Sequence, residues 1–133
     1  MGQYYKIVNI KKKEYITPHR FGDGAKLMEF SMSANGVLAG LAILLADGNG
    51  RGGGDLRSDN EIVGNWAGDN IVVAGDYADL GKFVKDKERN LYDIAVIEGK
   101  DISLQVLEAL LQSLIQKVLL HLSLRQQFLR LRL

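Results

Sequence analysis

The chain has 133 residues, 47% of them hydrophobic, which is enough for one domain with its own core. A formal net charge of +1 gives no signal of nucleic-acid binding, and the lack of cysteine excludes disulfides, thiolate metal sites and cysteine nucleophiles. Without cysteine and without a signal-peptide core at the start, we expect a cytoplasmic protein. The longest apolar run, Val37 to Ala46, is too short to span a bilayer.

Two strands joined as a hairpin are predicted at the start of the chain. Residues Tyr4 to Ile10 are rich in aromatic and β-branched side chains and alternate as in a half-buried strand. Glu14 to Thr17 gives a second strand, and Pro18 ends it because proline cannot donate to a strand ladder. Lys11 to Lys13 supply the polar turn between them.

The segment from residue 27 to residue 46 is predicted to contain a helix. Residues Leu27 to Phe30 fit either a short strand or a helical turn. A buried helix is predicted from Val37 to Ala46, with Asn35 as its cap and Gly48 placed to end it.

Residues 47–68 have little periodicity and predict a long irregular loop, a kind of segment that is often functional in a compact domain. The apolar run Asn70 to Ala74 follows and is typical of a central strand. Leu91 to Ile97, after a charged connection, predicts a further strand.

A long C-terminal helix is predicted from Ser103, which can cap it. After Glu108 the chain has no acidic residue, and its leucine content rises. We therefore divide the chain into one domain, residues 1–112, and a leucine-rich basic helical extension, residues 113–133. The predicted apolar face of the helix contains Leu107, Leu110, Leu111, Leu114, Val118 and Leu122.

Leucines around much of this helix favour self-association, because one small domain could hardly cover them. An anionic membrane surface is the second interpretation of its basic, acid-free face. A third interpretation is a core helix with an extended tail. A tail translated from a shifted reading frame would also have this composition.

Together these elements predict an α+β fold. A mainly antiparallel sheet is built from the N-terminal hairpin and the two later strands. One central helix and the long C-terminal helix pack on one of its faces.

The region from Asp47 to Gly81 is the strongest candidate for binding, since it holds nine of the fifteen glycines and seven of the sixteen acidic residues. Successive glycines let backbone N–H groups converge on an anion, and arginines add bidentate contacts. The loop follows a helix and lacks the Lys-Ser/Thr pair of a P-loop, and it matches a calcium loop only in part. A flexible turn-forming loop is the alternative. The candidate ligand-binding residues are Asp47, Asn49, Arg51, Asp55, Arg57, Asp76 and Asp79.

Asp76 and Asp79 follow an apolar strand, in a block that resembles the central metal-binding block of calcineurin-like metallophosphoesterases. Such enzymes need several histidines, whereas this chain has His19 and His121 alone. A structural role, in which the two carboxylates fix a turn through hydrogen bonds to the backbone, is the favoured interpretation.

Three sequence blocks resemble a group of small bacterial and phage proteins whose activity is uncharacterised. The blocks are MGQYYK at Met1 to Lys6, GAKLMEF at Gly24 to Phe30 and AGDYAD at Ala74 to Asp79. The resemblance covers about the first hundred residues. It implies a bacterial or phage cytosolic protein and transfers no catalytic role.

The leading functional hypothesis is a small cytosolic binding or interaction protein, in which the glycine-rich loop and the turn at Gly75 to Asp79 form an acidic contact surface for a small molecule or a protein. A rival hypothesis is a metal-dependent hydrolase or phosphate-handling enzyme that uses Asp55, Asp76 and Asp79 with a divalent ion. A third is a structural homo-oligomer built on the C-terminal helix. No particular cofactor is indicated.

Overall fold

The computed structural model describes residues 2–32, 36–51, 55–56 and 60–132. Its elements, in chain order, are β1 (Tyr5–Asn9), β2 (Glu14–Ile16), the 3₁₀ helix η1 (Pro18–Phe21), α1 (Leu27–Phe30), α2 (Val37–Leu45), β3 (Ile71–Gly75), α3 (Leu91–Glu98), β4 (Lys100–Asp101) and α4 (Ser103–Arg132). The predicted α+β class is confirmed. The segment at residues 27–30, left open from the sequence, is a helical turn.

The four strands form one sheet in the order β3-β1-β2-β4. β1 pairs antiparallel with β2 and with β3, and Tyr5 lies opposite Gly75. β4 runs parallel to β2. The predicted N-terminal hairpin and the strand near residues 70–74 are therefore confirmed, in a sheet that is mainly antiparallel. The predicted central position of that strand is wrong, because β3 lies at one edge of the sheet and, among the described strands, pairs with β1 alone.

One face of the sheet, here the α2 face, carries the larger core. Ile7 and Ile16 project from β1 and β2 into it, and α1, α2 and the first turns of α4 cover it. Gly40 permits close packing at this layer, since a Cβ there would lie 2.8 Å from the Phe21 ring and 3.0 Å from Val106 of α4. The buried members of this core are Ile7, Ile16, Phe30, Val37, Leu44, Trp66, Ile102 and Val106.

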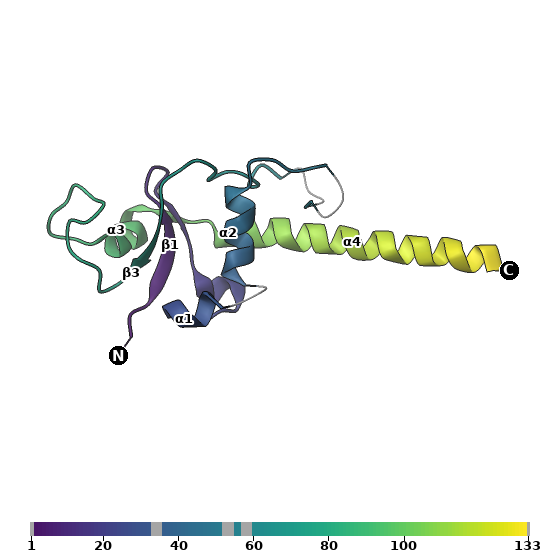
Figure 1. Ribbon diagram of the computed structural model, residues 1–133, viewed down its shortest axis with the longest axis horizontal. Helices are drawn as coiled ribbons and strands as arrows, with labels where there is room; N and C mark the ends of the chain where they lie inside the picture. The colour runs from purple at the N-terminus through teal and green to yellow at the C-terminus, as the bar shows by residue number, and fades with distance from the viewer. Residues whose placement is uncertain (1, 33–35, 52–54, 57–59, 133) are drawn as a thin grey trace.

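The opposite face, here the α3 face, is covered by α3. Val8 and Ala74 project from the sheet and pack against Leu91 and Ala95 of the helix. Figure 1 shows α3 on one side of the β1 and β3 strands, with α2 and α4 on the other. The sheet is thus the middle layer of three.

The prediction of a strand at Leu91 to Ile97 is wrong, because this segment is helix α3. Asn90 caps the helix, and its side-chain oxygen accepts a hydrogen bond from the Asp93 N–H at 2.9 Å. Leu91, Ile94 and Ala95 lie at helical spacing and face the sheet, whereas the β-branched Val96 and Ile97 are exposed. The cap at Asn90 and the helical spacing of the buried residues therefore favour a helix more strongly than Val96 and Ile97 favour a strand.

The termini of the two predicted helices also differ from expectation. The N-terminus of α2 is held by Asp23, whose Oδ2 accepts from the Val37 N–H at 2.6 Å, and the helix ends before Ala46 instead of at Gly48. Asn35 lies outside the described residues. Ser103 does not act as a cap, since its hydroxyl accepts from the Thr17 N–H at 2.9 Å. Asp101 accepts from the Ser103 N–H instead.

Helix α4 extends far beyond the body of the protein (Figure 1). Of its predicted apolar face, Leu107 and Leu110 are partly buried. Leu111, Leu114, Val118 and Leu122 are exposed, because the helix has by then left the sheet and α2.

Candidate functional site

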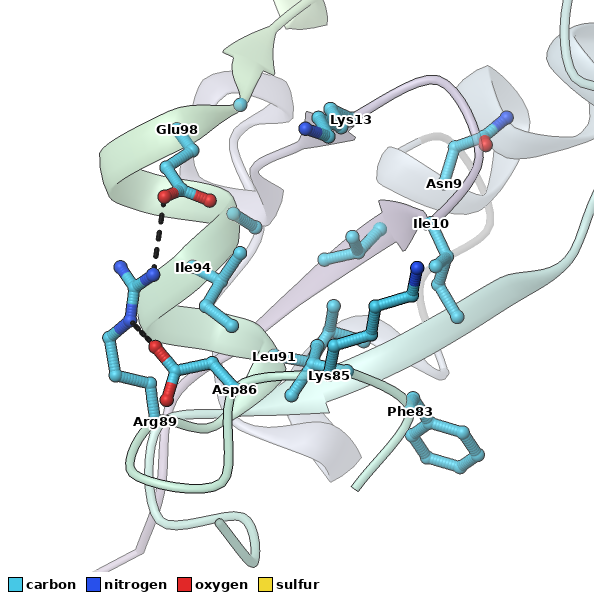
Figure 2. Close-up of a pocket in the computed structure, with 14 residues that line it drawn as sticks. Asn9, Ile10, Lys13, Phe83, Lys85, Asp86, Arg89, Leu91, Ile94 and Glu98 are labelled. Atoms are coloured by element: carbon cyan, nitrogen blue, oxygen red, sulfur yellow. Dashed lines mark hydrogen bonds and ion pairs between the residues drawn. The ribbon is translucent and has the colours of Figure 1, made fainter. Parts of the chain in front are cut away.

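A groove of about 430 Å³ lies on the α3 face, between the end of β1, the segment at residues 81–90 and one side of α3 (Figure 2). α3 is short, so it covers Val8 and Ala74 but leaves the sheet open beside it. The described residues that line this groove are Val8, Asn9, Ile10, Lys13, Phe83, Val84, Lys85, Asp86, Arg89, Leu91, Ile94, Ala95, Glu98 and Gly99.

The floor of the groove is apolar and rigidly held. Val8 comes from the inner strand β1, and Leu91 and Ala95 come from α3. Asn90 fixes the start of α3, because its side-chain amide donates to the backbone oxygens of Asp76 (3.0 Å) and Ala78 (3.3 Å) while its oxygen caps the helix. The groove therefore has a preformed surface that favours an apolar group.

One edge of the groove carries an ion-pair network. Arg89 donates to Asp86 at 2.8 Å and to Glu98 at 3.2 Å, as the dashed lines in Figure 2 show. The backbone N–H of Glu88 and the Arg89 guanidinium lower the pKa of Asp86, and the same pairing raises the pKa of Arg89. These ion pairs attach the 81–90 segment to α3, and the one guanidinium and two carboxylates together carry a net charge of −1.

Two lysines on the rim have no such partner. Within the described part of the chain, neither Lys13 nor Lys85 forms an ion pair. Lys13 comes from the β1–β2 turn and Lys85 from the 81–90 segment, and Figure 2 shows both beside the groove. The lining residues carry three cationic and two anionic side chains, so the groove has an excess of positive charge.

Backbone strain also gathers at this groove. Among the described residues, Lys13 (φ 54°) and Phe83 (φ 65°) are the two non-glycine residues with positive φ, and both line it. Such conformations cost of order 1 kcal/mol or more and often occur at binding sites. Phe83 is exposed although aromatic, and the Lys82 ammonium lies 5.4 Å from its ring centre.

A smaller hollow of about 240 Å³ adjoins the groove on the other side of Phe83, which lines both. It lies at the end of β3 and includes Gln3, Tyr77 and Asp79. The three blocks of the family resemblance meet near here. The Tyr4 N–H donates to Asp76 Oδ1 at 3.0 Å, and the Tyr5 N–H donates to the Ala25 oxygen at 2.9 Å.

A cluster of titratable groups occupies the same sheet face near β2. The Lys6 ammonium lies 5.3 Å from the Tyr15 ring centre and 5.5 Å from that of Tyr92, and it donates to Thr17 Oγ1 at 3.2 Å. Desolvation lowers the pKa of Lys6, against the attraction of Asp101, and burial raises the pKa of both tyrosines. Lys6 is outside the groove lining, so we assign this cluster a packing role.

The structure separates the sequence-predicted site residues into two groups. Asp47 and Asp55 are exposed in the loop after α2, where the Arg51 N–H donates to Asp55 Oδ2 at 2.8 Å, and Asn49 is half-buried there. Arg57 lies outside the described residues. Asp76 and Asp79 follow β3, at the opposite end of the body in Figure 1. The loop and the turn therefore do not form one acidic surface.

The favoured structural role of Asp76 agrees with its contacts. Its side chain accepts from the Tyr4 N–H, and its own N–H donates to the Tyr4 oxygen at 2.9 Å. Asp79 is exposed at the smaller hollow. Within the described ranges, no three His, Asp or Glu side chains lie close enough to hold a metal ion, so Asp55, Asp76 and Asp79 are not assembled as a metal site.

Sequence reasoning missed the groove and its lysines. Lys13 and Lys85 are far apart in the chain, and no motif links them. The available signal was local: Asn90 followed three residues later by Asp93 marks a helix start and would have predicted α3.

In comparison with known proteins, the chain matches no family model, no curated protein and no solved structure. The function is therefore argued from the geometry of the groove.

Proposed function

We propose that this is a non-enzymatic binding protein whose groove on the α3 face takes a small amphipathic anion, with an apolar body and one carboxylate, sulfonate or phosphate. The observation that carries the proposal is an open apolar groove with two lysines on its rim that form no ion pair with any described residue.

Size and lining fit this class of ligand. A volume of about 430 Å³ lies within the usual range for small-molecule sites, which are mostly apolar with a few polar groups at the edge. Val8, Leu91, Ile94 and Ala95 would contact the apolar body of the ligand. Burial of apolar surface then supplies most of the affinity, at roughly 25 cal/mol per Å².

Charge selects the ligand's polar group. Arg89 is neutralised by two carboxylates, whereas Lys13 and Lys85 approach the groove from two separate segments. An anionic group at the mouth would be attracted by both ammonium groups. A cationic ligand would be repelled by the same pair.

The described lining of the groove lacks the side chains that most often act as nucleophiles or as a histidine base. None of the described residues that line it is His, Ser, Thr or Cys. Asp86 has a lowered pKa and is held by Arg89, so it is a poor proton acceptor near neutral pH. These features favour binding over catalysis.

The acidic loop after α2 keeps a separate role in this proposal. Asp47 and Asp55 are exposed there and are available to a protein partner. This surface is distant from the groove (Figure 1).

The test is a titration of the labelled protein with 8-anilinonaphthalene-1-sulfonate, an amphipathic anion, followed by amide NMR. We expect shifts in residues 8–13 and 83–99. Replacing the rim charges by Lys13→Asn, which suits the positive φ, and by Lys85→Gln should each weaken binding about two- to fivefold, as for an exposed ion pair.

Lys100→Gln is the matched control, since Lys100 is exposed on β4 but does not line the groove. It should leave the affinity unchanged. Shifts confined to α4, or equal affinity in all three lysine variants and the parent protein, would contradict the proposal.

A further inference from the structure

The exposed part of α4 carries a regular apolar stripe. Leu111, Ile115, Val118, Leu122 and Leu129 are each 48–58% exposed. With Arg125 they follow 4-3-4-3-4 spacing and fall within about 80° of one another around a helix. We call these six positions the α4 seam: Leu111, Ile115, Val118, Leu122, Arg125 and Leu129.

The seam has the pattern of a coiled coil. Apolar residues at this spacing form the a and d positions of a heptad repeat, which packs against a second helix. The seam spans 18 residue steps, or about 27 Å of helix. No described element of the chain covers the seam, so we look for its partner in a second molecule.

A membrane is a weaker match to this helix. Residues Ser103–Arg130 are long and apolar enough to cross a bilayer by length and composition, with a mean hydropathy of 1.2 in the best window. However, Gln112, Ser123, Gln126, Gln127 and Arg130 share another side of the helix, within about 100° of one another. Polar groups of this kind are costly against lipid tails, whereas beside a helix seam they face water.

Charge then decides the orientation of a second helix. In a parallel pair, each seam position would face its own copy, and Arg125 would lie against Arg125 of the second chain. In an antiparallel pair centred near residue 120, the layers are Leu111 with Leu129, Ile115 with Arg125, and Val118 with Leu122. All six positions are used, and the two arginines are kept apart.

The antiparallel register also brings opposite charges together. The arginine-rich end of one α4 returns to the first turns of the other, where Glu108 is exposed and is the last acidic residue of the chain. Figure 1 shows that α4 leaves the body at the same end as the acidic loop after α2, which holds Asp47 and Asp55. A basic end thus meets an acidic region.

We propose that α4 binds the α4 of a second copy of this chain in antiparallel orientation, through the α4 seam. The expected particle is a dimer of twice 14.7 kDa. This inference is independent of the ligand proposed for the groove.

The test uses sedimentation equilibrium of the full chain. The parent protein should have the dimer mass. Val118→Glu and Leu122→Lys should each give the monomer mass, because each places a charge in both central layers. Gln127→Glu, on the opposite side of the helix, is the matched control and should stay dimeric.

Mixing the two seam variants separates the orientations. In the antiparallel pair, the introduced carboxylate of one chain faces the introduced ammonium of the other, and the remaining central layer is native, so a heterodimer should form. In a parallel pair both central layers stay mismatched, and no heterodimer forms.

Three results would overturn the proposal. The first is a parent chain that stays monomeric at about 100 μM, including one that binds phosphatidylserine vesicles as a monomer. The second is a dimer that persists in both seam variants. The third is that Val118→Glu and Leu122→Lys are both monomeric but form no heterodimer when mixed, although circular dichroism shows that each keeps the helix content of the parent protein.

Discussion

The two faces of the sheet are built from similar residues but are closed to different degrees. On the α2 face, three helices and Trp66 bury Ile7 and Ile16 completely. On the α3 face, one eight-residue helix covers Val8 and Ala74 and leaves a groove of about 430 Å³ beside it. The same strand β1 therefore supplies a closed core on one side and an open apolar surface on the other. We expect the first to provide most of the stability, and we propose the second as the ligand site.

The largest expected effect comes from emptying the closed face. Trp66 is fully buried, and its Nε1 donates to Glu14 at 2.9 Å. Trp66→Ala should lower the free energy of unfolding by about 3 to 5 kcal/mol, because it leaves a cavity and removes the donor to Glu14. Urea unfolding followed by circular dichroism measures this. A loss below about 1 kcal/mol would show that this face is not the main core.

The same substitution on each face compares them directly. Ala109 of α4 is fully buried, whereas Ala95 of α3 is buried but lines the groove. Ala109→Leu should cost about 1 to 3 kcal/mol of stability by overpacking. Ala95→Leu should cost less, since the larger side chain can enter the groove, and it should weaken binding of the anilinonaphthalene probe. Equal stability losses would mean that the two faces are equally packed.

The attachment of α3 can be loosened separately. Asn90→Ala removes the helix cap and the amide that donates to Asp76 and Ala78, at an expected cost of about 1 to 2 kcal/mol. Hydrogen exchange should rise first in residues 91–98, while α2 stays protected. Uniformly faster exchange would show that the two faces unfold together.

The smallest expected effect is electrostatic and lies on the α3 face. The pKa of Lys6 is lowered from 10.5, so the unfolded chain binds its proton more tightly than the folded chain does. Stability should therefore rise as the pH approaches 10.5, and Lys6→Met should lack this rise. Above pH 10 the raised pKa values of Tyr15 and Tyr92 make stability fall in both proteins, so the difference between the two curves isolates Lys6. Identical pH dependence would contradict this assignment.

Local patterns predicted most of the fold. The hairpin, the strand near residues 70–74, α2 and α4 follow from periodicity and turn residues that lie within each segment. α3 was missed because Val96 and Ile97 resemble strand residues, although both are exposed in the structure. Only the position of a segment in the whole fold shows which of its apolar residues are buried.

The candidate site depends on that whole fold. Lys13 and Lys85 line one groove because β3 pairs with β1, which brings the segment after β3 to the sheet face that α3 covers. Conversely, Asp55 and Asp76 are closer in sequence, but the loop after α2 and the turn after β3, which hold them, lie at opposite ends of the body in Figure 1. Composition identified the acidic glycine-rich region, but it could not show that the fold divides this region between two ends.

The central position of β1 has a consequence for how the protein folds. This strand is among the first segments to be synthesised, yet one of its neighbours is β3. After β2, the Thr17 N–H likewise finds its acceptor, the hydroxyl of Ser103, late in the chain. Contacts between segments so distant in sequence form slowly, because long loops must close before any of them is gained. We expect the local β1–β2 hairpin to form early, whereas the sheet around β1 stays incomplete until Ser103, about three quarters of the way along the chain, has been synthesised.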